Sequence, residues 1–546
     1  MASVKFDRKI FEKEIGKLNE ELKNKIALFG TTIESLNEKE IELDVTPNRP
    51  DLLSYHGFRR SFLSFLGKKT GLKSYALNKP EKNYEIIVSS SVKEVRPYTV
   101  CAIVKNLEFD DNKIKEIIDL QEKIHATLGR KRKKLAIGIY PLDKINLPIT
   151  YEAREPDKIK FIPLESDKEM SGLQILQNHE SGKAYSHLLA GKIKFPVFID
   201  KENKILSMPP IINSEETGRV TSKTKEVFIE CSGFDLNLLE KCLDIIVSIF
   251  GEMGGKIYQM KVGGKVYPNM KIDENPISLE RVNKLLGLNL KEKEIKDLLE
   301  KMGHSYEKGI VKTPSWRTDI LHEVDFIEDI AIAYGYDKFE YKIPEISTIG
   351  KENSEEIIKR KISEILIGLK LIETSNYHLT KKEDQFVKMG INEKQEKNFL
   401  EVENSKTEFN LLRKDLTHYL LKIFSENIDN EYPQKIFEIG RIFKLNSQEN
   451  IEEIEKLSIG CAPGNFTEVK QILDYLFKNL GLEINVKEQE KAESFFIEGR
   501  CANIIFENKI IGYLGEIHPK ILRNWKIKMP VSLLEIDLSE IFKKFN

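Results

Sequence analysis

Four acidic side chains gather around one predicted helix in the middle of the chain. Asp325, Glu328 and Asp329 stand three and four residues apart, which places their carboxylates on one side of a helix. Asp319 precedes the helix and can point along the same side. Like charges this close repel unless a cation or an arginine joins them, and Mg²⁺ prefers oxygen ligands of this kind. The spacing is compatible with a magnesium site, but by itself it favours a solvated acidic face with Asp319 as the helix cap.

A second group of polar side chains follows apolar strands. The segment Leu206–Thr221 carries two prolines that interrupt any helix, and Asn213 and Ser214 follow shortly after them. A buried-type strand, Val227–Cys231, then leads to Asp235. Polar groups gathered at strand ends suit a small-ligand pocket. The alternative is that Asn213 and Ser214 cap the next segment.

A dense basic run, Gly129–Lys134, lies between a predicted helix and the apolar strand Leu135–Ile139. Such a run is as well suited to neutralising phosphates as to forming a solvated loop tip. No aromatic residues are interleaved with it in the sequence, so any contact with nucleic acid here is expected to be with the backbone.

The elements that position the carboxylates form a compact domain. An apolar stripe at three- and four-residue steps predicts the carboxylate helix, and its members are Ile320, Val324, Ile327, Ala331 and Tyr334. Gly335 supplies the C-terminal stop. Upstream, Ser278 can cap a short helix, and Lys291–Met302 reads as a second one.

Both ends of the chain mix helices with strands. Near the N-terminus we expect a helix at Glu12–Ile26, a strand at Ile41–Val45 and a turn fixed by two prolines within Thr46–Gly57. In the last region, helices near Glu355–Leu371 accompany strands such as Lys435–Phe443. This mixture predicts an α+β domain with an antiparallel sheet.

Composition limits the kinds of function that this protein can have. The 546 residues carry 86 Lys and Arg against 87 Asp and Glu, a formal net charge of -1, so contact with RNA requires local patches or a partner. Five scattered cysteines without a CxxC pair argue against a disulfide framework or a zinc site. No signal peptide or membrane-length apolar run is apparent, which predicts a cytoplasmic protein.

Several phrases of the sequence resemble the beta subunit of phenylalanyl-tRNA synthetase, of the archaeal and eukaryotic type. Around the carboxylate helix they are Arg317–Ile320 and Glu323–Asp329, and nearer the N-terminus they are Thr46–Gly57, Asn178–Tyr185 and Ser207–Ser214. The family carries them in this order, and the resemblance spans essentially the whole chain.

The resemblance implies an α+β multidomain fold in four parts. These are an N-terminal α/β domain (1–77), an editing and tRNA-binding domain (78–265), a winged-helix-like magnesium-binding domain (270–346) and an inactive class II synthetase-like domain (350–546). Phe437–Gly440 stands where a working class II enzyme has an arginine-x-glutamate pair for ATP and amino acid. The chain alone is therefore not expected to make an adenylate.

The resemblance also implies a function within a heterotetramer of two alpha and two beta chains. The alpha chain joins phenylalanine to its tRNA with ATP and magnesium. This chain scaffolds it and hydrolyses mischarged tyrosyl-tRNA, since an apolar pocket rejects an added hydroxyl only about a hundredfold. The implied editing residues are Ser214, Asp235, Asn213 and Leu206, and the implied magnesium ligands are Asp319, Asp325, Glu328 and Asp329. A free-standing aminoacyl-tRNA editing hydrolase and a non-enzymatic RNA-binding assembly scaffold are the alternatives.

Overall fold

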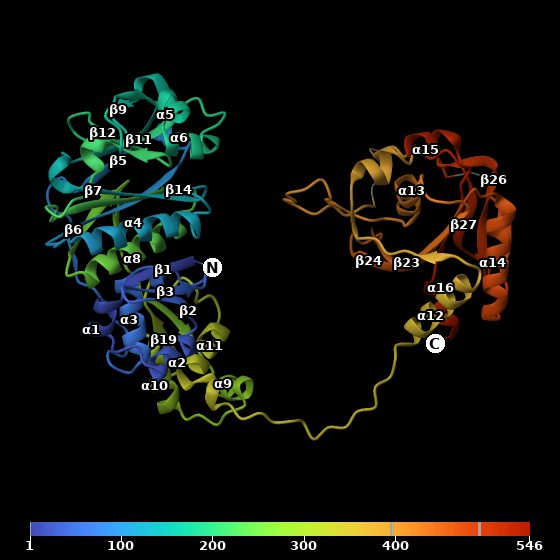
Figure 1. Ribbon diagram of the computed structural model, residues 1–546, viewed down its shortest axis with the longest axis horizontal. Helices are drawn as coiled ribbons and strands as arrows, with labels where there is room; N and C mark the ends of the chain where they lie inside the picture. Colours follow the sequence, from blue (N-terminus) through green and yellow to red (C-terminus); the bar gives the residue numbers. More distant parts are fainter. Residues whose placement is uncertain (1, 394–395, 397, 490–492, 546) are drawn as a thin grey trace. The chain divides into compact units, whose positions relative to one another are not determined.

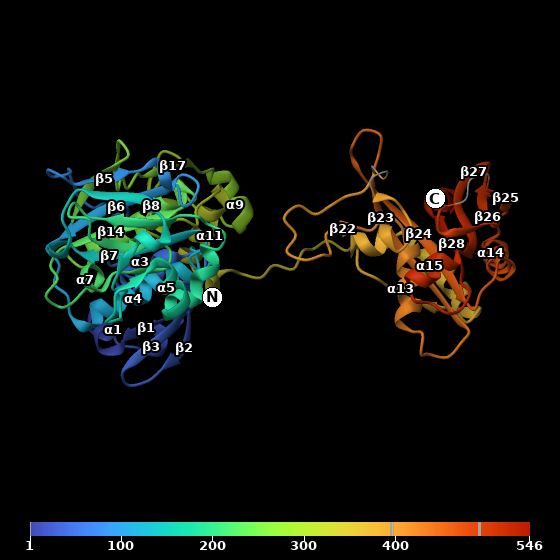
Figure 2. The same ribbon diagram turned by 90° about the horizontal axis from the view of Figure 1, so that it is seen from above.

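The computed structural model describes residues 2–393, 396, 398–489 and 493–545 (Figure 1). The chain forms two compact units, Met1–Ile343 and Pro344–Asn546. Both contain sheets covered by helices, as Figure 2 shows from a second direction. The mixed α/β multidomain architecture expected from the sequence is therefore observed.

The first unit begins with a three-stranded antiparallel sheet of order β1-β3-β2. Its strands are β1 (Ala2–Asp7), β2 (Thr32–Leu36) and β3 (Glu40–Val45). Helix α3 (Tyr55–Phe65) buries Phe58 and Phe62 against this sheet.

The prediction of a single helix at Glu12–Ile26 is wrong. The structure has α1 (Arg8–Glu14) and α2 (Glu20–Leu28) instead. Gly16 between them has a φ of 147°, a backbone conformation that favours glycine and ends the first helix.

An eleven-stranded sheet forms the centre of the first unit, with the main order β13-β12-β11-β8-β5-β15-β6-β14-β7 and with β4 and β16 paired to β15. The strands are β4 (Leu77–Asn78), β5 (Glu85–Val88), β6 (Tyr98–Lys105), β7 (Leu135–Pro141), β8 (Ile149–Arg154), β11 (Phe195–Ile199), β12 (Ile205–Met208), β13 (Ile212–Asn213), β14 (Val227–Gly233), β15 (Lys256–Val262) and β16 (Lys265–Tyr267). The neighbours β6, β14 and β7 are antiparallel and almost wholly buried.

Two long helices pack on this part of the sheet, α4 (Asp111–Ala126) and α8 (Leu236–Glu252) (Figure 1). Helix α8 is apolar almost all round, which matches its burial between the sheet and α3. The short helices α5 (Gly172–Asn178) and α6 (Glu180–Tyr185) lie at the other end of the sheet, close to β11 and β12 (Figure 1).

A small domain completes the first unit. Its sheet has the order β17-β19-β18, from strands β17 (Asp273–Pro276), β18 (Ser305–Glu307) and β19 (Ile310–Thr313). Its helices are α9 (Leu279–Leu286), α10 (Glu292–Lys301) and the carboxylate helix α11 (Glu323–Tyr334).

The buried face of α11 differs in part from the predicted stripe. Phe326, Ile327 and Ile330 are buried, whereas Val324 is 44% exposed. His322, rather than Asp319, caps the helix. Helix α11 therefore starts later than the stripe predicts, and its inward face is rotated toward Phe326.

The second unit is built on a seven-stranded sheet of order β20-β23-β24-β28-β27-β26-β25. The strands are β20 (Ile372–Glu373), β23 (Gln434–Leu445), β24 (Ile451–Ala462), β25 (Asn485–Glu488), β26 (Phe496–Phe506), β27 (Lys509–Ile517) and β28 (Ser532–Asp537). Apart from the parallel pair β20–β23, the sheet is antiparallel, as the sequence predicts.

Helices cover both faces of that sheet. One apolar cluster joins it to α12 (Ser354–Gly368), α14 (Phe466–Leu480) and α16 (Ser539–Phe545), and another joins it to α13 (Thr417–Glu426) and α15 (Pro519–Asn524). In the part of the chain that the structure describes, no helix is long and apolar enough to span a membrane.

Candidate functional site

A cavity of about 610 Å³ opens beside α4 and β7 in the large sheet domain. One wall is apolar, with Ile114, Ile117 and Ile118 from α4 and Ile137 and Ile139 from β7. The other side is formed by residues 209–213, which contain the two prolines recognised in the sequence, and by α6. Its size and its combination of apolar walls with polar groups suit a small-ligand site.

Two polar residues of the cavity lining, Asn213 and Glu230, meet at the buried Tyr140, which is not itself among the lining residues that the structure describes. The Tyr140 hydroxyl lies 2.8 Å from Oγ of Ser207, 3.3 Å from Oδ1 of Asn213 and 3.3 Å from Oε1 of Glu230. Gly138 makes this meeting possible, because a Cβ there would stand 2.2 Å from the Tyr140 hydroxyl and 2.6 Å from Oε1 of Glu230. Any side chain at position 138 would displace the cluster.

Glu230 is the unusual member of the group. It is 1% exposed, and among the described residues its Oε2 atom has no hydrogen-bond partner. Burial raises the pKa of its carboxyl to about 8, despite the opposing effects of the Arg96 charge and of the Tyr140 and Ser232 hydroxyls. At neutral pH the group is therefore largely protonated, and its O–H can donate a hydrogen bond.

The structure places the predicted pocket residues at different depths. Asn213 lines the cavity. Ser214 is buried beside it, and its backbone N–H donates to the carbonyl of Leu206 (2.8 Å), whose side chain belongs to the apolar core. Among the described residues, the cavity lining includes neither Ser214 nor Leu206.

Asp235 lies elsewhere and has a structural contact. It is exposed at the N-cap of α8, where its carboxylate accepts from the backbone N–H of Leu238 (3.2 Å). Glu230, five residues earlier in the same segment, does line the cavity, as do Glu122, Glu165 and Glu180. From the sequence, Glu230 is not identified as a site residue, because it lies inside a buried-type strand. A carboxyl in such a strand is nevertheless unusual, and it could have indicated a functional group.

His125 also lines the cavity, but its two ring nitrogens are occupied. The backbone N–H of Ile137 donates to its Nε2 (2.9 Å), and its Nδ1 faces Glu122 (3.3 Å). Burial lowers the pKa of His125, and the hydrogen bond from His125, aided by Arg132, lowers the pKa of Glu122 to about 2. A neutral histidine held in this way stabilises the wall and is not placed to take a proton from a ligand.

The four predicted magnesium ligands do not gather into one site. Arg317, which is buried, holds Asp319 through Nη2 (2.8 Å) and Asp329 through the same atom (2.6 Å). His304 makes a second contact with Asp329 (2.7 Å). Burial alone would raise the pKa of Asp329, but Arg317 and the hydrogen bond from His304 hold that pKa well below its usual range. Arg317 therefore offsets the charge repulsion between Asp319 and Asp329, the repulsion from which the metal site was inferred.

The other two carboxylates remain on the outside of α11. Asp325 accepts from the backbone N–H groups of Leu321 and His322 (both 2.7 Å), and Glu328 is exposed. Within the described residues, no group of three or more His, Cys, Asp or Glu side chains is arranged to hold a metal. Asp319 and Asp329 are engaged by Arg317, whereas Asp325 and Glu328 are not, and magnesium ligation by any of the four stays a prediction.

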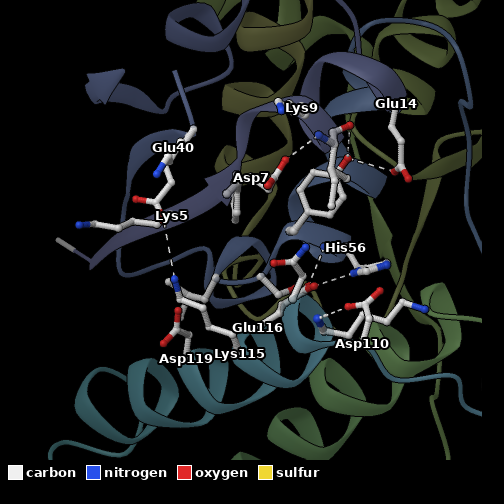
Figure 3. Close-up of a pocket in the computed structure, with 18 of the residues that line it drawn as sticks. Lys5, Asp7, Lys9, Glu14, Glu40, His56, Asp110, Lys115, Glu116 and Asp119 are labelled. Carbon is white, nitrogen blue, oxygen red and sulfur yellow. Dashed lines mark hydrogen bonds and ion pairs between the residues drawn. The ribbon is translucent and has the colours of Figure 1, made fainter. Parts of the chain in front are cut away.

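A second cavity, of about 650 Å³, lies between the N-terminal sheet and the opposite side of α4 (Figure 3). Some of its charged groups pair with one another. His56 contacts Glu116 through Nδ1 (2.8 Å) and through its backbone N–H (2.9 Å), and Lys115 lies 3.7 Å from Glu40. We regard it as the polar seam that joins the N-terminal domain to α4.

In the second unit, one ion pair lies on β23, where the sequence lacks the arginine-x-glutamate pair, and another joins the neighbouring strands β24 and β28. Glu438 contacts Arg413 (2.6 Å), and Glu535 contacts Lys456 (2.6 Å). Glu438 also accepts from the side-chain amide of Asn376 (2.6 Å). Both carboxylates therefore have their charge and hydrogen-bond partners within the same domain.

Comparison with known proteins finds both matching family models and similar whole proteins. Three family models match the chain: the B3/4 domain at residues 86–241, the tRNA synthetase B5 domain at 276–336 and the phenylalanyl tRNA synthetase beta chain CLM domain at 340–538. The chain is 40% identical over 511 residues to the phenylalanine–tRNA ligase beta subunit of Thermococcus sibiricus, covering 91% of this chain and 90% of that protein. Its identity to the Archaeoglobus fulgidus protein of the same name is 36% over 540 residues, covering 97% of each.

A solved structure is similar as well. The crystal structure of an N-terminal fragment of the phenylalanyl-tRNA synthetase beta subunit from Pyrococcus horikoshii matches with a TM-score of 0.58 and 38% identity, over 61% of this chain and 99% of the fragment. The folds and the matched models together define a subunit of an aminoacyl-tRNA synthetase. Within that class, the chain belongs to the family of phenylalanine–tRNA ligase beta subunits.

Proposed function

We propose that this chain is the non-adenylating subunit of a phenylalanine–tRNA ligase and that its sheet domain hydrolyses tyrosyl-tRNA made in error. The observation that carries the proposal is Glu230, a buried carboxyl whose Oε2 atom lacks a partner among the described residues and which lines a cavity of about 610 Å³. A buried polar group without a partner is costly, so a ligand that supplies one gains affinity.

The hydroxyl of a tyrosyl group is such a partner, and a phenylalanyl group has none. With tyrosine bound, Oε2 of Glu230 gains a hydrogen bond at the phenol end of the pocket. With phenylalanine bound, the same atom stays unsatisfied beneath an apolar ring. A site built to hydrogen-bond a hydroxyl rejects the analogue that lacks it far better than an apolar pocket rejects an added hydroxyl. The geometry therefore supports selective removal of tyrosine.

Asn213 and Tyr140 supply polar contacts beside Glu230. Oδ1 of Asn213 faces the Tyr140 hydroxyl, which leaves the amide NH₂ group of Asn213 to donate to a ligand in the pocket. Ser214 fixes this segment, because its backbone N–H bonds the carbonyl of Leu206. We assign Ser214 and Leu206 to holding Asn213 in place, and Asp235 to capping α8.

The second unit supports a scaffolding role beside a catalytic alpha subunit. Its sheet keeps Glu438 and Glu535 in internal ion pairs, so these acids are not available to bind ATP or an amino acid. Adenylation, with its ATP and magnesium, then belongs to the alpha partner of a heterotetramer. Any magnesium ion held at α11 would take Asp325 and Glu328.

Replacing Glu230 in the assembled complex tests the proposal. Glu230→Ala removes the group that we assign to the tyrosyl hydroxyl, and we expect hydrolysis of tyrosyl-tRNA to fall by roughly a hundredfold, corresponding to about 2 to 3 kcal/mol. Phenylalanine attachment to tRNA should be unchanged, which serves as the internal control. Asp235→Asn is the matched control variant. Equal loss in both variants, or no loss in Glu230→Ala, would show that the pocket is wrongly assigned.

A further inference from the structure

The end of the sheet beside this cavity combines positive charge with exposed aromatic rings. The basic turn, defined as Gly129–Lys134, follows α4 and leads into β7. Four of its side chains are exposed, namely Arg130, Lys131, Lys133 and Lys134. In the described part of the chain no ion pair engages these four. The turn therefore presents positive charge that the protein itself does not neutralise.

The backbone holds this turn in an unusual shape. Arg130, Lys131 and Arg132 have φ values of 47°, 54° and 62°, three consecutive left-handed residues without a glycine among them. The N–H of Lys134 donates to the carbonyl of Gly129 (2.9 Å), and the N–H of Arg132 donates to the carbonyl of His125 (3.1 Å). Left-handed residues with side chains are unfavourable, so such a run persists only where its surroundings hold it.

Arg132 fastens the turn to the cavity. Its Nη1 donates to the carbonyl of Ile211 (2.8 Å), its Nη2 contacts Glu122 (2.7 Å), and its guanidinium lies 4.4 Å from the ring centre of Tyr185. Ile211, Glu122 and Tyr185 all line the cavity, as does Arg132 itself. The exposed cations are thus carried at the rim of the proposed hydrolytic pocket.

Two exposed aromatic residues lie at the same end of the sheet. Gly233, the last residue of β14, pairs with Leu135 of β7 on one side and with Tyr98 of β6 on the other. Phe234 follows Gly233 and is 50% exposed, and Tyr98 is 43% exposed. The buried Arg96 lies 5.3 Å from the centre of the Phe234 ring and fixes it there. The sequence hides this arrangement, because the sheet brings the rings to the basic turn from two other strands.

We propose that the basic turn together with Tyr98 and Phe234 binds the single-stranded 3′ end of the tRNA and directs it into the cavity. Cations that contact phosphates and aromatic faces that stack bases are the two elements of single-strand binding without sequence readout. This inference rests on the proposed editing function, because it assigns the surface by which that pocket receives its substrate.

The first test measures binding of the full chain to a short single-stranded RNA with the sequence of the tRNA 3′ end. The charge variant is Arg130→Asn with Lys131→Asn, since asparagine tolerates left-handed φ better than most residues. We expect affinity to fall roughly tenfold at moderate salt, and the slope of log affinity against log salt to shrink by about 1.4, from about 0.7 for each lost contact. The stacking variant, Phe234→Leu, should weaken binding roughly fivefold with an unchanged slope.

The matched control removes two exposed lysines from the hairpin β15–β16, Lys261→Asn with Lys265→Asn, which does not line the cavity. We expect it to bind like the unmodified chain. Binding that is equal in the charge variant and the unmodified chain, or absent in the unmodified chain, overturns the inference.

A second readout separates the surface from the pocket. Tyrosine esterified to the 3′ position of adenosine carries no phosphate, so its hydrolysis should suffer much less in the charge variant than hydrolysis of tyrosyl-tRNA. An equal loss on both substrates overturns the inference, because it means that the turn only shapes the pocket. If the RNA binds through the turn but neither substrate is hydrolysed by the unmodified protein, the surface stands and the proposed editing function fails.

Discussion

At the scale of single residues, the site depends on Glu230 being close to Tyr140. Gly138 leaves the space that the two side chains occupy, and burial raises the pKa of Glu230 to about 8. The phrase ending in Asn213 and Ser214 could be found from the sequence. Glu230 could not be, because only the pairing of β14 with β7 brings it opposite Gly138.

The pKa of Glu230 predicts how stability depends on pH. The folded protein binds this proton more tightly than the unfolded chain, whose carboxyl titrates near 4.5, so the group's contribution is fully present below about pH 4.5 and is lost as the pH rises toward 8. Glu230→Gln removes this titration. In the unmodified chain the free energy of unfolding should fall between pH 5 and pH 8. In Glu230→Gln we expect this fall to be smaller by up to about 4 kcal/mol, as measured by urea denaturation at each pH.

The exposed acid Glu202 offers the control for that measurement, since Glu202→Gln removes a carboxylate from a surface turn. Its pH profile should match that of the unmodified chain. A Glu230→Gln profile that is equally unchanged would mean that the carboxyl at position 230 is ionised in the folded protein.

At the scale of elements, an arginine joins the loop before α11 to the helix. The periodicity of the sequence predicted the helix, and the spacing of its acids was identified correctly. Spacing could not reveal that Arg317, from the preceding loop, turns inward to meet Asp319 and Asp329. The residue spacing within a helix does not show which side chains from other segments contact it.

This arrangement predicts different consequences for two acids of the helix. Asp329→Asn leaves the buried Arg317 without one of its two carboxylates, and we expect a loss of about 3 to 5 kcal/mol in the free energy of unfolding, with or without magnesium. Glu328→Gln changes an exposed acid and should alter stability by less than about 0.5 kcal/mol when magnesium is absent. Thermal denaturation in EDTA and in excess Mg²⁺ measures both. A loss in Asp329→Asn that appears only with magnesium would restore that residue to the ligand set.

At the scale of the whole molecule, the two compact units have different tasks in our account. The first carries a cavity with an unsatisfied buried acid, and the second carries a sheet whose acids are internally paired. Several helices and strands of both could be predicted from period and turn signals, among them α11 and β23. The pairing order of the large sheet could not, because its neighbours come from distant parts of the chain.

The division of tasks predicts that adenylation needs a partner subunit. The chain alone should show no phenylalanine-dependent exchange of pyrophosphate into ATP, and adding a catalytic alpha subunit should produce it. Exchange by the chain alone would mean that the Glu438 and Glu535 ion pairs open to admit ATP.

The most direct measurement of the central claim follows the deacylation of preformed tyrosyl-tRNA and phenylalanyl-tRNA by the assembled complex in a single turnover. The account predicts that tyrosyl-tRNA is hydrolysed at least about a hundredfold faster, because only its hydroxyl satisfies Glu230. Equal rates for the two, or a tyrosyl-tRNA rate no higher than that of spontaneous hydrolysis, would contradict it.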